Sequence, residues 1–236
     1  SAQVSGLNMA VRNANDAISM LQTIEGATKE ITNMLGRMRE LAVQSASGTY
    51  TDTDRDALNL EFGALMDEIT RIAQNTEWNG QAVLRGNVAV TLENNGSTDD
   101  VAETHTIQLG SSSGQTMALT INTWVPTTTA DNDGTAVNVA LTTNGSADAY
   151  GTAVLYGASS DDATAAADIR IGIDTVAEAG IAITNLDLAI NGAAAERAKY
   201  GSYMARLQHA SDNLANIATN TSASLSQIAD ADYAVE

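Results

Sequence analysis

The residues in this sequence whose types could do chemistry are its carboxylates and two histidines. Asp131 and Asp133 stand in the run Asp-Asn-Asp-Gly, whose alternating oxygen ligands resemble the first positions of a calcium-binding loop. The glutamate that should follow as the twelfth residue of such a loop is missing. A solvated turn is the better interpretation, so we predict no metal site and retain these two aspartates as the only candidate ligands.

The histidines and the other carboxylates do not form a catalytic pattern. His105 and His209 are far apart, and neither has a second metal-ligating residue at helical spacing. Glu103 could pair with Asp99 or Asp100, but an acidic chain provides many such pairs by chance. The sequence has no nucleophile beside a base, no phosphate-binding glycine loop and no HExxH motif. We therefore predict a protein that is not an enzyme and needs no cofactor.

Composition predicts a narrow helical bundle and limits the partners. Of the 236 residues, 44% are hydrophobic but only 4% are aromatic, so the core must consist of small aliphatic side chains. The 29 acidic and 11 basic residues give a net charge of −18, which repels nucleic acid and anionic lipid. No apolar run approaches the roughly 20 residues of a membrane span. We expect neither nucleic-acid binding nor membrane insertion.

Two helices are predicted in the first third of the chain. Apolar residues recur at alternating steps of three and four from Val4 to Ala42, which predicts one long amphipathic helix over residues 1–47. A polar turn follows, and Thr51 or Thr53 can cap a second helix that ends near Asn75. The second helix should fold back antiparallel on the first, because the turn between them is short.

The middle of the chain reads as β structure and the end as a third helix. Alternation of period two predicts strands at residues 88–92, 106–109 and 117–121, with shorter strands at 137–141 and 152–156. From about residue 163 the helical period returns and continues as a heptad pattern. The side chains that we expect to form the apolar seam of the bundle are Val11, Ile18, Leu35, Leu65, Ile69, Met204, Leu207, Leu214 and Leu225.

These elements predict an α+β fold, an elongated antiparallel bundle of two N-terminal helices and one long C-terminal helix. A β-rich insertion should lie at its distal end. We expect a discontinuous helical domain from residues 1–87 and 163–236, and an outer, variable domain from residues 88–162. The helical stripes are under way at both ends of the sequence, so we also expect a chain that lacks terminal segments.

Three segments closely resemble bacterial flagellins: Arg12 to Ala46, Asn75 to Leu84, and Ser211 to Glu236. The resemblance implies a structural subunit that self-assembles into the flagellar filament for motility. It implies secretion to the extracellular flagellum at the cell surface, with other flagellin subunits as partners. In the full-length protein an export chaperone and the filament cap would be further partners. Without the terminal segments, polymerisation is expected to fail.

The resemblance also implies recognition by the vertebrate Toll-like receptor that senses flagellin. The matching positions are Arg37, Leu41 and Gln44, whose spacing of four and three places them on one helix face, with Glu68 on the second helix. Arg37, Glu40 and Gln44 could equally serve subunit packing alone. A different class of function, a cell-surface adhesin or glycan-binding module that uses the β region, remains the alternative. Filament assembly compared with glycan binding by residues 88–160 would separate the two.

Overall fold

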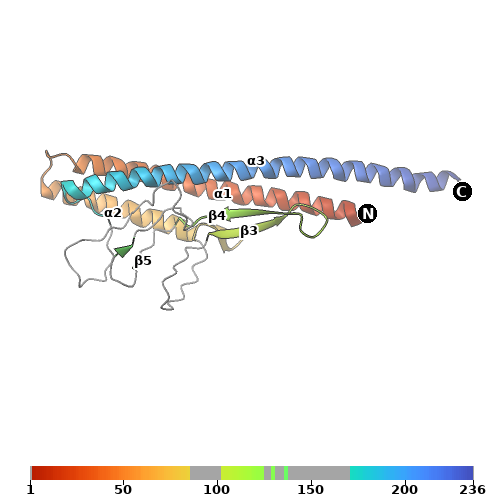
Figure 1. Ribbon diagram of the computed structural model, residues 1–236, viewed down its shortest axis with the longest axis horizontal. Coiled ribbons are helices and arrows are strands. Elements are labelled where there is room, and N and C mark those ends of the chain that lie inside the picture. Colours follow the sequence, from red (N-terminus) through yellow and green to blue (C-terminus); the bar gives the residue numbers. More distant parts are fainter. Residues whose placement is uncertain (1, 86–101, 125–128, 131–135, 138–170, 236) are drawn as a thin grey trace. The chain divides into compact units, whose positions relative to one another are not determined.

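The computed structural model describes residues 2–85, 102–124, 129–130, 136–137 and 171–235. Its helices are α1 (Ala2–Ser45), α2 (Asp52–Asn75) and α3 (Val176–Val235), and Figure 1 draws α1 and α3 as long unbroken helices. Its strands form three two-stranded sheets: β1 (Glu77–Trp78) with β2 (Gln81–Ala82), β3 (Glu103–Gln108) with β4 (Thr116–Ile121), and β5 (Thr129–Ala130) with β6 (Ala136–Val137). The prediction of three helices with a β-rich insertion is confirmed.

The chain divides into two compact units, and both long helices contribute to each. Unit 1 comprises Ser1–Thr23, Thr104–Thr120 and Ala198–Glu236, and unit 2 comprises Ile24–Glu103 and Ile121–Arg197. The β3–β4 hairpin thus shares a unit with the first part of α1 and the last part of α3. The domain boundaries proposed at residues 87 and 163 lie outside the described residues and stay a prediction.

Unit 2 is a three-helix bundle with a core of mostly aliphatic side chains, to which Phe62 and the fully buried Trp124 add two aromatic rings. Arg39 pairs with Asp187 at 2.5 Å and Glu25 lies 3.6 Å from Arg197, so α1 and α3 run antiparallel here. The core side chains from α1, α2 and α3 in turn are Ile31, Leu35, Met38, Leu41, Phe62, Met66, Ile69, Ala182, Leu186 and Ala189. Alanines on α3 allow the close helix approach that the low aromatic content predicted.

Thr51 caps α2, as the sequence predicted. Its hydroxyl accepts the Asp54 backbone N–H at 3.3 Å, and the Asp54 carboxylate accepts the Thr51 backbone N–H at 3.0 Å. Both bonds satisfy donors at the helix start that have no partner within the helix. The two hydrogen bonds from Thr51, first that of its side chain and then that of its backbone, lower the pKa of Asp54.

The start of α3 corrects the prediction of a helix from residue 163. Residues 171–175 are not helical, and α3 begins at Val176. Ile173 is buried there: its N–H donates to Asn59 Oδ1 at 3.1 Å, and the Ser45 hydroxyl donates to its carbonyl. Because these side chains satisfy the backbone of Ile173, the segment stays outside the helix despite its apolar spacing. A Thr175–Glu178 capping box then opens the helix.

The carboxylate of Asp174 at this entry predicts an unusual pH dependence. Partial burial and the nearby Glu178 and Asp56 raise its pKa. The folded chain therefore holds this proton more tightly than the unfolded chain, and ionised Asp174 opposes folding at neutral pH. We expect Asp174→Asn to raise the free energy of unfolding at neutral pH by at most about 1 kcal/mol, because the residue is largely exposed.

Urea denaturation at neutral pH and near about pH 4 checks this expectation, since the gain should vanish as the carboxyl becomes protonated. Asp187→Asn is the control of opposite sign. A hydrogen bond from Arg39 lowers the pKa of Asp187, so this variant should lose stability at neutral pH, and the loss should fade in acid. A gain for Asp174→Asn that is independent of pH would contradict the assignment.

Unit 1 has a smaller core, and it corrects one predicted seam residue. Its buried cluster is Leu7, Ala10, Leu214 and Ala218, with Val11 and Leu109 packed against it. Leu225 is 44% exposed. The heptad position at Leu225 is therefore not part of the buried seam.

The other seam predictions divide into buried and half-buried positions. Four of these side chains are fully or nearly fully buried: Leu35, Ile69, Leu207 and Leu214. Four others are half-buried: Val11, Ile18, Leu65 and Met204. The apolar stripe therefore has its deepest positions where two neighbouring helices cover it and shallower ones at its edges.

The strands predicted at 106–109 and 117–121 are confirmed as β3 and β4, which form a hairpin. Its loop closes through the Leu109 N–H, which donates to the Gln115 carbonyl at 2.8 Å. Asn13 of α1 donates to the Gln108 carbonyl at 3.3 Å, and Figure 1 shows the hairpin beside this part of α1. The strands predicted at 88–92 and 152–156 lie outside the described residues, as does all of 137–141 except Val137, which belongs to β6.

Candidate interaction surface

Arg37 is the centre of an exposed polar cluster between α1 and α2 in unit 2. Its Nε and Nη2 donate to Glu61 Oε1 at 2.9 and 2.8 Å, and its Nη1 donates to Glu40 Oε2 at 3.0 Å. The side chain is 49% exposed. These hydrogen bonds, that to Glu61 first, raise the pKa of Arg37 and hold its guanidinium in one orientation.

Leu41 corrects the expectation of one exposed face with Arg37 and Gln44. It is only 1% exposed, whereas both of its presumed companions are exposed. Because α1 packs against two helices, its buried arc is wider than a single seam and extends to Leu41 at its edge. Leu41 therefore supports the helix from the inside.

Gln44 lies at the end of α1, where a turn leads into α2. Its amide donates to the Tyr50 hydroxyl at 3.1 Å. Beneath this contact the buried Arg55 guanidinium donates to the carbonyls of Ser45 at 3.0 Å, Ser47 at 3.1 Å and Tyr50 at 2.7 Å. The Arg55 side chain thus fixes the turn, together with the Tyr50 N–H, which donates to the Ser47 carbonyl at 3.4 Å.

Glu68 is on the exposed side of α2, bound to Arg71 at 2.7 and 2.5 Å. That hydrogen-bonded pair lowers the pKa of Glu68. Glu61 precedes Glu68 by seven residues, so both carboxylates lie along one line of the helix. We name the exposed set Arg37, Glu40, Gln44, Glu61 and Glu68 the α1–α2 face.

Sequence reasoning missed Glu61. Its seven-residue spacing from Glu68 was visible, but its role depends on which carboxylate of α2 stands beside Arg37. That partner follows only from the register of the two helices. The short turn fixes this register. Counting back along α1 from Ser45 reaches Arg37, and counting forward along α2 from Arg55 reaches Glu61, so the sequence contained the signal that pairs them.

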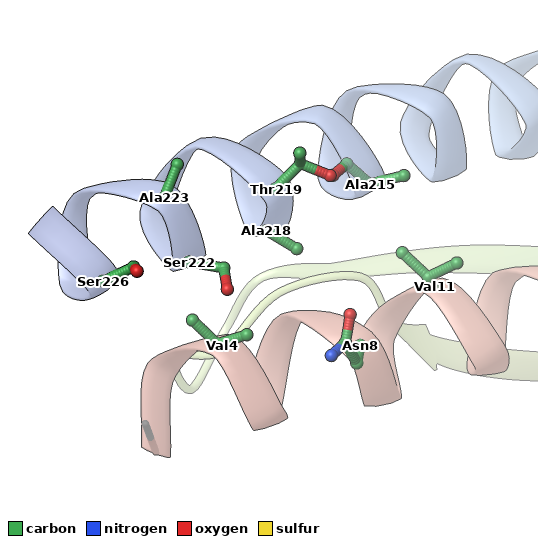
Figure 2. Close-up of a pocket in the computed structure, with 9 residues that line it drawn as sticks. All are labelled: Val4, Asn8, Val11, Ala215, Ala218, Thr219, Ser222, Ala223 and Ser226. Carbon is green, nitrogen blue, oxygen red and sulfur yellow. The ribbon is translucent and has the colours of Figure 1, made fainter.

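A groove in unit 1 offers no chemistry of this kind. It has a volume of about 550 Å³ and lies between the first turns of α1 and the last part of α3 (Figure 2). Its walls carry small uncharged side chains: Val4, Asn8, Val11, Ala215, Ala218, Thr219, Ser222, Ala223 and Ser226. The groove therefore brings no titratable group into a site.

The candidate metal ligands Asp131 and Asp133 lie outside the described residues. Among the residues that the structure does describe, no three histidine or carboxylate side chains are grouped to hold a metal ion. None of the described helices is long and apolar enough to cross a membrane. The α1–α2 face remains the candidate site with the most definite geometry.

Comparison with known proteins assigns the fold to a family. The family model of the bacterial flagellin N-terminal helical region matches residues 1–89, and that of the C-terminal helical region matches residues 183–236. Polar flagellin F of Vibrio parahaemolyticus is 32% identical over an alignment that covers the whole chain and 77% of the relative. The chain belongs to the bacterial flagellin family.

Further flagellins agree with this assignment. Flagellin B of Vibrio cholerae is 30% identical, again over the whole chain and 77% of the relative. The crystal structure of Bacillus cereus flagellin matches with a TM-score of 0.58 and 32% identity, covering 91% of this chain and 94% of the other. This flagellin is therefore a structural subunit of the bacterial flagellar filament, and the family implies an extracellular place for it. The comparisons give no support to the adhesin alternative.

Proposed function

We propose that the α1–α2 face is a packing surface between flagellin subunits in the filament. On the free subunit, the same face would be read by the vertebrate flagellin-sensing Toll-like receptor. The observation that carries this proposal is the Arg37 guanidinium, which carboxylates of two helices fix at a half-exposed position. A charged group held in this way loses little side-chain entropy when a partner binds it.

Arg37 retains the capacity to bind a partner. Its bonds to Glu61 and Glu40 use three of the five N–H groups of a guanidinium. The remaining donors can meet carbonyl or carboxylate oxygens of another chain, and the flanking carboxylates can accept from donors there. The face thus offers both hydrogen-bond donors and hydrogen-bond acceptors, as expected of the polar rim of a protein interface.

Leu41 has an indirect role in the proposal. Its side chain is buried beside Met38, below the exposed residues of α1. Substituting it would move the helix that carries Arg37, so a loss of binding would report packing and not a direct contact. Leu41→Ala is therefore a poor test of recognition, although the sequence placed it among the contact positions.

Arg37→Ala tests receptor recognition. We expect receptor binding to weaken by about thirtyfold, the equivalent of about 2 kcal/mol, because a positioned arginine is lost. The matched control is Arg39→Ala: Arg39 lies on the same helix, is 43% exposed and is paired with Asp187. Binding is measured by surface plasmon resonance, with helix content checked by circular dichroism. Equal affinities of folded wild type and Arg37→Ala would refute the receptor role.

Filament assembly tests the packing role separately. In cells whose filament is built from this flagellin, we expect Arg37→Ala to shorten or abolish filaments seen by electron microscopy, while Arg39→Ala leaves them intact. Normal filaments from Arg37→Ala would remove the face from subunit packing.

Other partners in this proposal rest on family membership. A filament protein must leave the cell before it assembles, so we include an export chaperone and the filament cap among its partners, and secretion to the cell surface as its route. We also propose that the chain has no catalytic activity, since the families matched are structural. Affinity capture of export components by the full-length chain would test the first part.

A further inference from the structure

Asn79 and Gly80 form the two-residue turn between β1 and β2. The strands pair in antiparallel register, with Trp78 opposite Gln81 and Glu77 opposite Ala82. Asn79 has a φ of 50° and Gly80 a φ of 78°, so both central residues are left-handed, as in a type I′ turn. In such a turn the closing hydrogen bonds join the flanking residues, and the Gly80 N–H has no place in the ladder.

We infer that Asn79 is a site of spontaneous deamidation. The backbone nitrogen of Gly80 attacks Cγ of Asn79, forming a five-membered succinimide as the bond from Cγ to the side-chain nitrogen breaks. That nitrogen leaves as ammonia and carries away the Gly80 amide proton. Water then opens the ring at either carbonyl and leaves aspartate or isoaspartate. No oxidant or reductant is needed, and the only other reactant is water.

Three features of the turn favour this reaction. Both residues are exposed, so water and base reach them freely. Gly80 has no Cβ to obstruct the approach of its nitrogen to the asparagine side chain. Asn79 must rotate out of the turn conformation before the attack, and β1 and β2 hold only two residues each, so little pairing opposes that rotation.

A second Asn-Gly pair in the structure provides an internal comparison. Asn191 and Gly192 have the same chemistry but lie inside α3, where the helix uses the glycine N–H as a donor to the preceding turn. Attack there requires several helical hydrogen bonds to break, each of which stabilises the folded helix. The fold therefore directs the reaction to Asn79 and away from Asn191.

The modification would loosen part of the unit 2 core. An isoaspartate carries the main chain through the side-chain carbon and lengthens the turn, which a two-residue hairpin cannot accommodate. The hairpin sets the register in which the Val83 N–H donates to the Thr76 carbonyl at 3.2 Å and Leu84 accepts from the Trp124 N–H at 2.8 Å. Val83 and Leu84 are both buried, so a change in the hairpin would disturb the packing of the core.

The test is ageing of the folded chain in mildly alkaline buffer at body temperature, followed by peptide mapping with mass spectrometry. We expect aspartate and isoaspartate to accumulate at Asn79 at least about tenfold faster than at Asn191. In urea the two peptides should react at similar rates, because the sequence Asn-Gly is the same. Equal rates in the folded chain, or an unmodified Asn79, would overturn the inference. The other Asn-Gly pairs, at Asn95 and Asn144, lie outside the described residues. Their peptides are separate in the map, so they do not interfere with the comparison.

Asn79→Gly is the matched variant, because Gly-Gly also supports a type I′ turn but has no side-chain amide. We expect its urea midpoint to stay constant during ageing, while that of the wild type falls with the isoaspartate content. If Asn79→Gly loses stability at the same rate, isoaspartate at the turn is not the cause. An Asn79→Asp variant provides the standard for the aspartate product and should keep the turn.

Discussion

Arg55→Met is expected to lower the free energy of unfolding of unit 2 by about 3 kcal/mol. The Arg55 side chain is 9% exposed, and its guanidinium serves the three carbonyls that end α1 and form the turn to α2. Methionine preserves most of the apolar stem but none of the donors. Each buried carbonyl left without a donor costs about 1–3 kcal/mol, and those nearest the surface recover part of this from water.

Urea denaturation followed by far-ultraviolet circular dichroism measures the effect. Arg71→Met is the control, because Arg71 is also a paired arginine on α2 but is 61% exposed. An exposed pair of this kind contributes about 0–1 kcal/mol, so the control should be nearly silent. Similar losses for the two variants would show that Arg55 acts through surface charge and not through the turn.

Leu207→Asp is expected to unfold unit 1, with a loss of about 4 kcal/mol or more. Leu207 has no exposed surface, and an aspartate there would bury a carboxylate without a partner as well as remove the apolar contacts. The thermal unfolding midpoint should fall sharply, or no cooperative transition should remain.

Leu225→Asp is the matched control for this change. Both leucines occupy the heptad seam of α3 in the sequence, yet Leu225 is 44% exposed. The control should change stability by no more than about 0.5 kcal/mol, the usual range for exposed positions. A large loss for Leu225→Asp would mean that a partner covers that position in the folded chain.

The sequence predicts local structure well where the deciding residues are neighbours. The Thr51 cap needs only Asp54, and the strands β3 and β4 need only the alternation of side chains within each strand. Each of these signals acts within a few residues. Their outcome does not depend on which helix packs where.

The same sequence does not predict features that depend on helix register. Ile173 is not helical, because Asn59 and Ser45 bond its backbone, although its spacing suits a helix. Leu41 is buried although it was predicted on an exposed face, and Leu225 is 44% exposed although its heptad position predicted burial. Glu61 belongs to the α1–α2 face only because the turn brings it beside Arg37. Periodicity identifies an apolar side, but it cannot say how much of that side a partner covers.

The pairing of Arg39 with Asp187 has a kinetic consequence. The two residues are separated by 148 positions in the chain, so α1 acquires its α3 partner only after most of the protein has been made. At about 5–20 residues per second, α1 waits roughly 7–30 seconds on the ribosome for that contact. Contacts between residues so far apart in sequence slow folding, because the intervening chain loses conformational entropy before the contact can stabilise the fold. During that interval the side of α1 that α3 later covers is open to other proteins.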